Sequence, residues 1–213
     1  MTSAPRLVLA THNEHKVHEL QQMLADADLD VEVLAMEAFP EIGEVPETEV
    51  TFVGNATLKA EAVAAATGLP ALADDSGLTV EVLGGMPGIF SARWSGRHGG
   101  EVLPRAEKDR RNLQLLLDQL SDVPDAHRQA AFRCAAVLAV PGQPTRSVEG
   151  SVVGVIVREP EGENGFGYDP VFRPDGGDRT LAQYTDAEKN AISHRGTAMR
   201  AMIPVLREAL AQA

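Results

Sequence analysis

Apolar residues in the first part of the chain alternate between short runs and helical spacing. The run Leu7–Ala10 predicts a short buried strand, and Val31–Leu34 predicts a second. Between them the apolar residues recur every three or four positions, which predicts a helix over 14–25. Asn13 is well placed to cap that helix.

The next segment changes from polar to strongly apolar. Residues 40–49 are acidic and contain Pro and Gly, so they predict a loop. Residues 52–67 are rich in Ala with one apolar face, which predicts a helix that Gly68 and Pro70 end. Residues 71–74 and 78–82 then predict two strands around a turn at Asp75–Gly77.

The second half repeats these patterns. Its predicted elements are a long connection over 84–100, a helix over 103–120, a strand over 130–140, a strand over 148–157, a Gly-rich loop over 159–178 and a helix over 193–211. The two strands predict a hairpin joined at Pro141 and Gly142. Pro204 predicts a kink or a restart in the last helix.

Early alternation of strands and helices followed by a late hairpin predicts an α/β protein with a mixed sheet. A chain of 213 residues suits one domain, 1–213, built from two lobes. We expect boundaries into a second lobe near Pro124 and Arg158.

Composition narrows the class of function. The net charge of −12 disfavours nucleic acid as a partner, because such binding needs a basic surface. The single cysteine, Cys134, rules out an internal disulfide and favours a cytoplasmic location and a core role for that thiol. No apolar run approaches the roughly 18 residues that span a bilayer, so no membrane association is expected.

The junction of the first strand and helix predicts an anion site. Free N–H groups and the positive end of the helix dipole gather there. The segment adds polar and charged side chains: Thr11, His12, Asn13, Glu14, His15 and Lys16. From this segment alone an ordinary Asn-capped helix is the better explanation, because Asn is a common N-cap. Zinc binding by His12, His15 and His18 is disfavoured because no further ligand is evident.

Two acidic segments offer hard oxygen ligands for a cation such as Mg²⁺. Asp74 and Asp75 are adjacent on a predicted strand, so only one is expected to face a site, while the other caps the turn or meets a backbone donor. The acidic loop holds Glu41, Glu44, Glu47 and Glu49. A solvated turn and a solvated loop are the alternatives.

Two later segments contain candidate binding residues: the first has glycines beside aromatic rings, and the second has three cationic side chains. The segment 165–170 places glycines beside Phe166 and Tyr168, which suits close approach and stacking of a flat ligand, or a tight turn with core aromatics. In 188–196, Lys189, His194 and Arg195 cluster near an expected helix start with Ser193 as its N-cap. Cations are electrostatically unfavourable there, which hints at a functional demand.

Six ordered motifs resemble the inosine triphosphate pyrophosphatase family, whose bacterial members are called XTP/dITP diphosphatases. The motifs are T-x-N-x-x-K from Thr11, T-F-x-x-N-A-x-x-K-A from Thr51, A-D-D-S-G-L from Ala73, P-G-I-x-S-A-R-W from Pro87, G-F-G-Y-D-P-V-F from Gly165 and E-K-N-A-I-S-H-R-G from Glu188. The resemblance covers nearly the whole chain.

The resemblance implies an elongated two-lobed fold with a central twisted mixed sheet and the active site in the cleft between the lobes. It implies a homodimer that hydrolyses ITP, dITP and XTP to the monophosphate and pyrophosphate with Mg²⁺. By matching motifs, it implies triphosphate binding by Thr11–Lys16 and Lys59, and a substrate contact by Ser76. It also implies metal binding and proton acceptance by Asp75, and metal association for Glu47.

For the base, the resemblance implies binding by Phe166, Gly167, Tyr168 and Asp169. Reading of the purine's six-position oxygen falls to Lys189, His194 and Arg195. One departure concerns Gly54, where many relatives have Glu, so Glu47 or water must serve the metal here. Two alternatives stay open: a pyrophosphatase for modified pyrimidine nucleotides, and a nucleotide sensor without activity.

Overall fold

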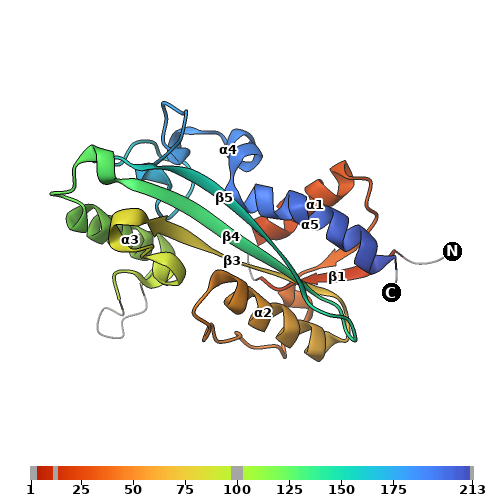
Figure 1. Cartoon of the computed structure of the whole chain (residues 1–213). Coiled ribbons are helices and arrows are strands. Elements are labelled where there is room, and N and C mark those ends of the chain that lie inside the picture. Colours follow the sequence, from red (N-terminus) through yellow and green to blue (C-terminus); the bar gives the residue numbers. More distant parts are fainter. Residues whose placement is uncertain (1–3, 12–13, 97–102, 212–213) are drawn as a thin grey trace. The chain divides into compact units, whose positions relative to one another are not determined.

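The computed structural model describes residues 4–11, 14–96 and 103–211. Its strands are β1 (Arg6–Leu9), β2 (Glu32–Leu34), β3 (Ala71–Val80), β4 (Gln129–Ala139), β5 (Arg146–Ile156) and β6 (Phe172–Pro174). Its α-helices are α1 (Glu14–Asp26), α2 (Phe52–Thr67), α3 (Arg105–Gln119), α4 (Asp186–Ile192) and α5 (His194–Leu210). Together they form an α/β protein (Figure 1).

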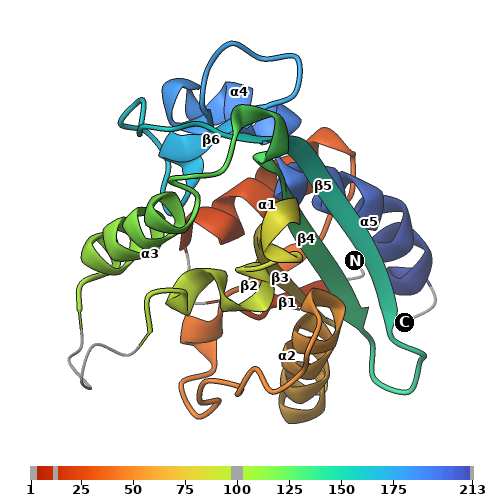
Figure 2. The same cartoon turned by 60° about the vertical axis from the view of Figure 1, so that its left-hand side comes forward.

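One sheet contains all six strands, in the order β2-β1-β3-β4-β5-β6. β1 pairs in parallel with β2 and with β3, whereas β5 and β6 are antiparallel. The sheet is therefore mixed, as predicted. β4 and β5 are neighbours joined by residues 140–145, and this short connection makes them the expected hairpin (Figure 2).

The chain forms two compact units. The first contains residues 1–75, 134–150 and 197–213, and the second contains 76–133 and 151–196. The changes between units fall within β3, β4, β5 and α5, so the boundaries expected near Pro124 and Arg158 are wrong. The boundaries fall inside long strands and a helix, so there is no linker segment whose composition could mark them.

In the first unit, strand residues alternate between two apolar layers. Leu7 and Leu9 of β1 pack with α1 and α5, whereas Val8 between them packs against α2. The helices therefore cover both faces of this part of the sheet (Figure 1). The period of two is the ordinary consequence of strand geometry.

In the second unit, one apolar cluster joins α3, the ends of β3 and β4, and β6. It includes Leu78, Leu116, Phe132 and Phe172. The buried Arg128 guanidinium donates to the carbonyls of Leu120, Ile156 and Val157, so it ties the end of α3 to the end of β5. Burial lowers the pKa of Arg128, and the charge of Arg158 adds to this effect.

Several elements differ from the expectations. β3 is one strand of ten residues, so the predicted turn at Asp75–Gly77 is wrong. β6 and α4 lie in segments predicted as loop or left unassigned. α5 continues through Pro204 without a restart. The expected N-cap of α5 is confirmed, because Ser193 accepts from the Gly196 N–H.

Candidate active site

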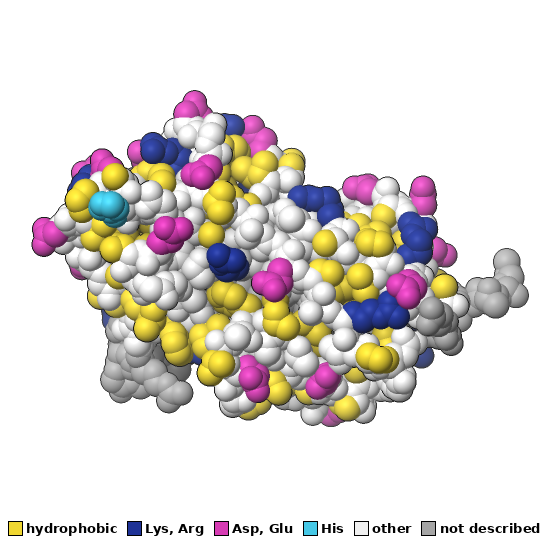
Figure 3. Space-filling view, viewed as in Figure 1, with side chains coloured by type: hydrophobic (Ala, Val, Ile, Leu, Met, Phe, Trp, Pro, Cys, Tyr) yellow, Lys and Arg dark blue, Asp and Glu magenta, His cyan; other side chains and the backbone are white. Residues whose placement is uncertain are grey.

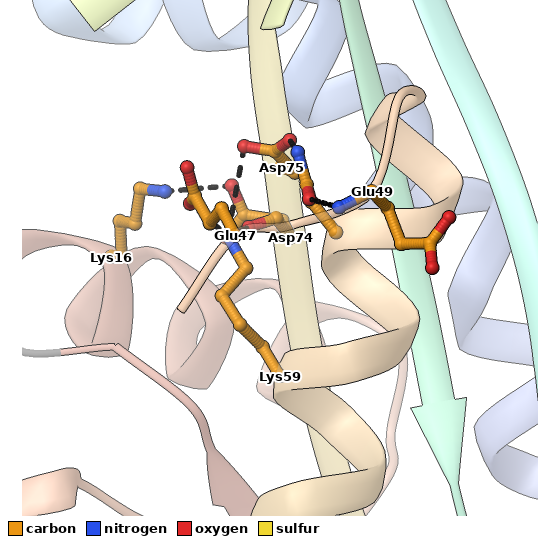
Figure 4. Close-up of polar contacts among 7 residues, drawn as sticks. Lys16, Glu47, Glu49, Lys59, Asp74 and Asp75 are labelled. Carbon is orange, nitrogen blue, oxygen red and sulfur yellow. Dashed lines mark hydrogen bonds and ion pairs between the residues drawn. The ribbon is translucent and has the colours of Figure 1, made fainter. Parts of the chain in front are cut away.

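Lys16 lies in the first turn of α1, directly after β1. Its ammonium donates to Asp74 Oδ2 at 2.6 Å (Figure 4). The Asp74 carboxylate is 2% exposed and the Lys16 side chain 25% exposed. The ion pair therefore has a buried acidic partner, while the cation keeps access to solvent.

Lys59 projects from α2 toward the same stretch of β3. Its ammonium donates to the Asp74 carbonyl at 2.9 Å and to Glu47 Oε1 at 3.1 Å. Asp75 Oδ1 lies 3.6 Å from the same nitrogen. One lysine thus brings together the backbone of β3, its Asp75 carboxylate and a glutamate of the preceding loop (Figure 4).

Helix α2 places Lys59 because its start and end are well defined. Thr51 caps the helix by accepting from the Gly54 N–H, and Gly68 ends it in the left-handed conformation with φ of 68°. Between them Ala56, Ala60 and Val63 are buried against the sheet. This packing fixes the rotation of the helix and hence the direction of Lys59.

The carboxylates around Lys59 fit a magnesium ion that takes only one or two of its ligands from the protein. Mg²⁺ commonly uses one or two carboxylates and takes its other ligands from substrate phosphates and water. Asp75 and Glu47 supply two carboxylates beside one cation. Among the described residues there is no group of three or more His, Cys, Asp or Glu side chains arranged for a metal.

A second polar cluster lies in the second unit, around Asp169. Its Oδ2 accepts from Lys189 Nζ at 2.6 Å and from the Phe166 N–H at 2.8 Å. Burial raises the pKa of the Asp169 carboxyl, and the charge and hydrogen bond of Lys189 offset this only in part. Gly165 has φ of 75°, and a Cβ at this position would collide with the Asp169 carboxylate.

Phe166 presents an exposed ring beside two cations. Its side chain is 59% exposed. The Lys189 ammonium lies 4.7 Å and the Arg105 guanidinium 4.9 Å from the ring centroid. An exposed aromatic ring held by its own backbone contact to Asp169 suits stacking of a flat ligand.

The remaining residues of this segment hold it in place. The Gly167 N–H donates to Asp109 Oδ2 at 3.3 Å, and the Tyr168 hydroxyl donates to the Ser91 carbonyl at 2.9 Å. Burial raises the pKa of Tyr168, with a smaller contribution from the charge of Asp109. Tyr168 is therefore a neutral donor that anchors the loop rather than an acid or a base.

His194 and Arg195 begin α5. The His194 ring stacks on Phe132, with centroids 4.9 Å apart and an interplanar angle of 11°. His194 Nδ1 and Arg195 Nε and Nη2 are buried atoms. Lys189, by contrast, lies in the last turn of α4, where a cation is favourable, so placing all three at a helix start was wrong.

The structure places most of the expected site residues. Thr11 is half-buried after β1, and Ser76 follows Asp75 on β3. Of the acidic loop, Glu47 reaches Lys59, whereas the Glu49 carboxylate points away from the lysine (Figure 4). His12 and Asn13 lie outside the described residues, as do the side chains of Glu14 and His15.

Two residues of the site were missed. Asp74 was expected to cap a turn or meet a backbone donor, yet it binds Lys16 through its carboxylate and Lys59 through its carbonyl. Asn55 is fully buried and donates to Asp75 Oδ2 at 3.2 Å. The signal for Asn55 was available, because a polar amide interrupts the apolar face of α2.

Known proteins resemble the chain over nearly its full length. The model of the Ham1 family matches residues 7–205. A protein of Streptomyces avermitilis named dITP/XTP pyrophosphatase is 58% identical over 205 residues, which is 96% of this chain and 98% of that protein. A protein of Mycobacterium tuberculosis with the same name is 49% identical over 208 residues, covering 97% and 98%.

Solved structures agree with the sequence matches. A HAM1 protein from Coxiella burnetii has a TM-score of 0.85 at 40% identity, covering 96% of this chain and 99% of that one. A nucleoside-triphosphatase, dITP/XTP pyrophosphatase, from Mycobacterium abscessus has a TM-score of 0.77 at 47% identity, covering 94% and 99%. The chain therefore belongs to the Ham1 family, as its motifs predicted.

Proposed function

We propose that the protein hydrolyses deaminated purine nucleoside triphosphates, such as ITP, dITP and XTP, to the monophosphate and pyrophosphate. The observation that carries the proposal is the cluster of Lys16 and Lys59 with Asp74, Asp75 and Glu47. The names of the relatives support the substrate class. Removing such nucleotides keeps deaminated bases out of DNA and RNA.

The phosphate end of the substrate belongs to the first unit. Lys16 and Lys59 supply positive charge for the phosphates, and Thr11–Lys16 adds the N-terminal end of α1. Asp75 and Glu47 would hold Mg²⁺, which when bound neutralises charge on the phosphates. Triphosphate binding replaces the contacts of both lysines to carboxylates with contacts to phosphate oxygens.

In the chemical step, Asp75 orients a water molecule and accepts its proton as the oxygen attacks the α phosphorus. The bond from that phosphorus to the bridging oxygen breaks, and pyrophosphate leaves with the electron pair. Lys16 and Lys59 stabilise the charge on this leaving group. Positioning and fixed charge supply most of the rate gain, as in other phosphoryl transfers.

The base end belongs to the second unit. Phe166 offers a ring for stacking, and the Asp169–Lys189 pair holds the loop that carries it. His194 and Arg195 donate to the oxygen at position six of the purine. An adenine amino group cannot accept those hydrogen bonds, so discrimination of about 10⁴ against ATP is expected.

Two further properties are part of the proposal. The protein acts as a homodimer, as its resemblance to the family implies. It acts in the cytoplasm, where free nucleotides are found and where a chain with one buried thiol needs no disulfide. Among the described residues, no helix combines the length and the apolar character needed to cross a bilayer.

The experiment is a substrate panel with Mg²⁺. The purified protein is given dITP, ITP, XTP, ATP, GTP and modified UTP and CTP, and pyrophosphate and inorganic phosphate are measured separately. We expect pyrophosphate from the deaminated purines, and a fall in kcat of about 10³-fold in Asp75→Asn with the fold retained. Equal kcat/KM for ITP and ATP, or release of inorganic phosphate instead, would refute the proposal.

A further inference from the structure

A buried amide joins the acidic loop to the Asp75 carboxylate. Asn55 lies on α2 with its side chain fully buried. Its Oδ1 accepts from the Glu49 N–H at 3.0 Å, and its Nδ2 donates to Asp75 Oδ2 at 3.2 Å. An amide with its oxygen and its nitrogen used at opposite ends is fixed against rotation.

The chemistry of the two neighbours determines which way the amide points. A backbone N–H can only donate, so the amide oxygen must face Glu49. The NH₂ group then faces Asp75, and an ionised carboxylate, which only accepts, requires a donor there. Asparagine satisfies both neighbours, whereas aspartate at the same position satisfies only the first.

The two hydrogen bonds act on the two carboxylates that meet at Lys59. Asn55 holds Asp75 by Oδ2, and Oδ1 is the atom 3.6 Å from the Lys59 ammonium. The bond to Glu49 holds the loop just after Glu47, whose carboxylate is 3.1 Å from that ammonium. One buried side chain therefore contacts both the Asp75 carboxylate and the loop that carries Glu47.

We propose that Asn55 is a positioning residue for the reaction, which orients the Asp75 carboxylate by Oδ2 and keeps the Glu47 loop beside it. The inference rests on the hydrolysis proposed above, because it assigns Asn55 a task in that reaction. Asn55 itself touches neither the phosphates nor the attacking water. Its effect is expected on the rate of the chemical step rather than on substrate affinity.

The decisive variant is Asn55→Asp. A carboxylate oxygen still accepts from the Glu49 N–H, so the loop contact survives, but an acceptor now faces Asp75. We expect kcat with dITP to fall about 10²-fold, because a displaced reacting group has this effect. KM should change by less than about threefold, since the phosphate and base contacts are untouched.

Asn112→Asp is the matched control. Asn112 is also a buried asparagine on a helix, α3, and its Oδ1 accepts from the Ser95 N–H at 2.7 Å. The same chemical change there should leave kcat and KM at their wild-type values for the folded protein. If Asn55→Asp also keeps the wild-type kcat, Asn55 has no positioning role.

A stability measurement tests the contact between Asn55 and Asp75 without substrate or metal. Asn55→Asp should lower the thermal midpoint, and adding Asp75→Asn should recover it, because the donor and the acceptor are then exchanged between the two positions. The double variant should keep the loss of about 10³-fold in kcat expected for Asp75→Asn. A double variant no more stable than Asn55→Asp would show that the two side chains do not interact.

The two proposals fail separately. If the wild-type protein does not release pyrophosphate from dITP, the proposed function is wrong, while the recovery of stability still reports on the contact. If the wild-type protein is active and Asn55→Asp keeps its kcat, only the role of Asn55 is wrong.

Discussion

Asp74 and Asp75 are adjacent in sequence but have different partners. Asp74 is buried and binds Lys16, whereas Asp75 is partly exposed and contacts Lys59 and Asn55. Strand alternation predicted that only one of the two carboxylates would face the site, yet both bind a lysine of the same cluster. It did not predict Lys16 as the partner of Asp74, because the two residues are 58 positions apart in the chain.

Gly54 marks a close approach that the sequence shows only as a departure from relatives. A Cβ at this position would lie 2.6 Å from Glu49 Cβ and 3.0 Å from Thr51 Oγ1. The Glu49 backbone is held by Asn55, so the loop cannot yield without disturbing that contact. The absence of a side chain at Gly54 therefore lets the acidic loop pack on α2.

Gly54→Ala should destabilise the protein by about 1 kcal/mol in urea unfolding, because forced overlap costs more than the helix gains. Helix propensity alone predicts the opposite sign, a gain of about 1 kcal/mol. Gly54→Ala combined with Glu49→Gly removes the overlap with the Glu49 side chain, which is the closest contact, and should recover part of the lost stability. A stabilising single variant would contradict the close packing.

Among the elements, helices followed local pattern most closely. α2 has the predicted bounds, and its cap and its end are set by Thr51 and Gly68 within the segment itself. β3 did not, although Asp75–Gly77 has good turn residues. β3 pairs with β1 at Ala71 and Leu72 and lies beside β4 in the sheet, so it stays extended, and both aspartate side chains bind residues on helices, Lys16 on α1 and Asn55 on α2.

α5 shows the same competition between local preference and packing. Pro204 removes a backbone donor, at a cost of about 3 kcal/mol in a helix interior. Five apolar residues of the helix, on either side of Pro204, are buried in the core: Ala198, Met199, Met202, Leu206 and Ala209. Their burial outweighs the lost hydrogen bond, so the helix continues.

α3 allows a test of pH dependence. Hydrogen bonds from Arg110 and Arg111 lower the pKa of Glu107 from 4.5 to about 2. A carboxyl whose pKa is lower in the folded protein stabilises it above its unfolded pKa, and that contribution is lost as the pH falls toward about 2.

Glu107→Gln should therefore reduce stability at pH 7, and the difference from the wild type should shrink below about pH 4.5. The effect is small because the group is exposed, and 1 M salt should reduce it further. Urea unfolding from pH 7 to 3 measures the difference. A difference independent of both pH and salt would exclude the charge interaction.

At the scale of the whole molecule, the net charge of the chain does not describe the charge around the candidate site. The chain carries a net charge of −12, and on the face in Figure 3 the described acidic and basic side chains are interspersed rather than gathered by sign. The cations of the site are therefore local features, paired with carboxylates in each unit. Such pairing keeps each site near neutrality before a charged substrate arrives.

Removal of magnesium should abolish activity without unfolding the protein. With EDTA we expect no pyrophosphate release, because phosphate charge is then unneutralised. The thermal midpoint should change by less than about 3 °C, since two carboxylates without phosphates bind the ion weakly. A fall of about 10 °C or more would indicate a structural metal instead.

The sequence by itself determined the α/β class, most helix and strand bounds, and the family, since periodicity, caps and ordered motifs are local properties. Tertiary structure alone decided the single β3 strand, the two units and the partners of Lys16, Lys59 and Asp75. Those contacts join residues that lie far apart in the chain, such as Asn55 and Asp75 or Lys16 and Asp74. Folding brings them together, and no local pattern encodes the distance between them.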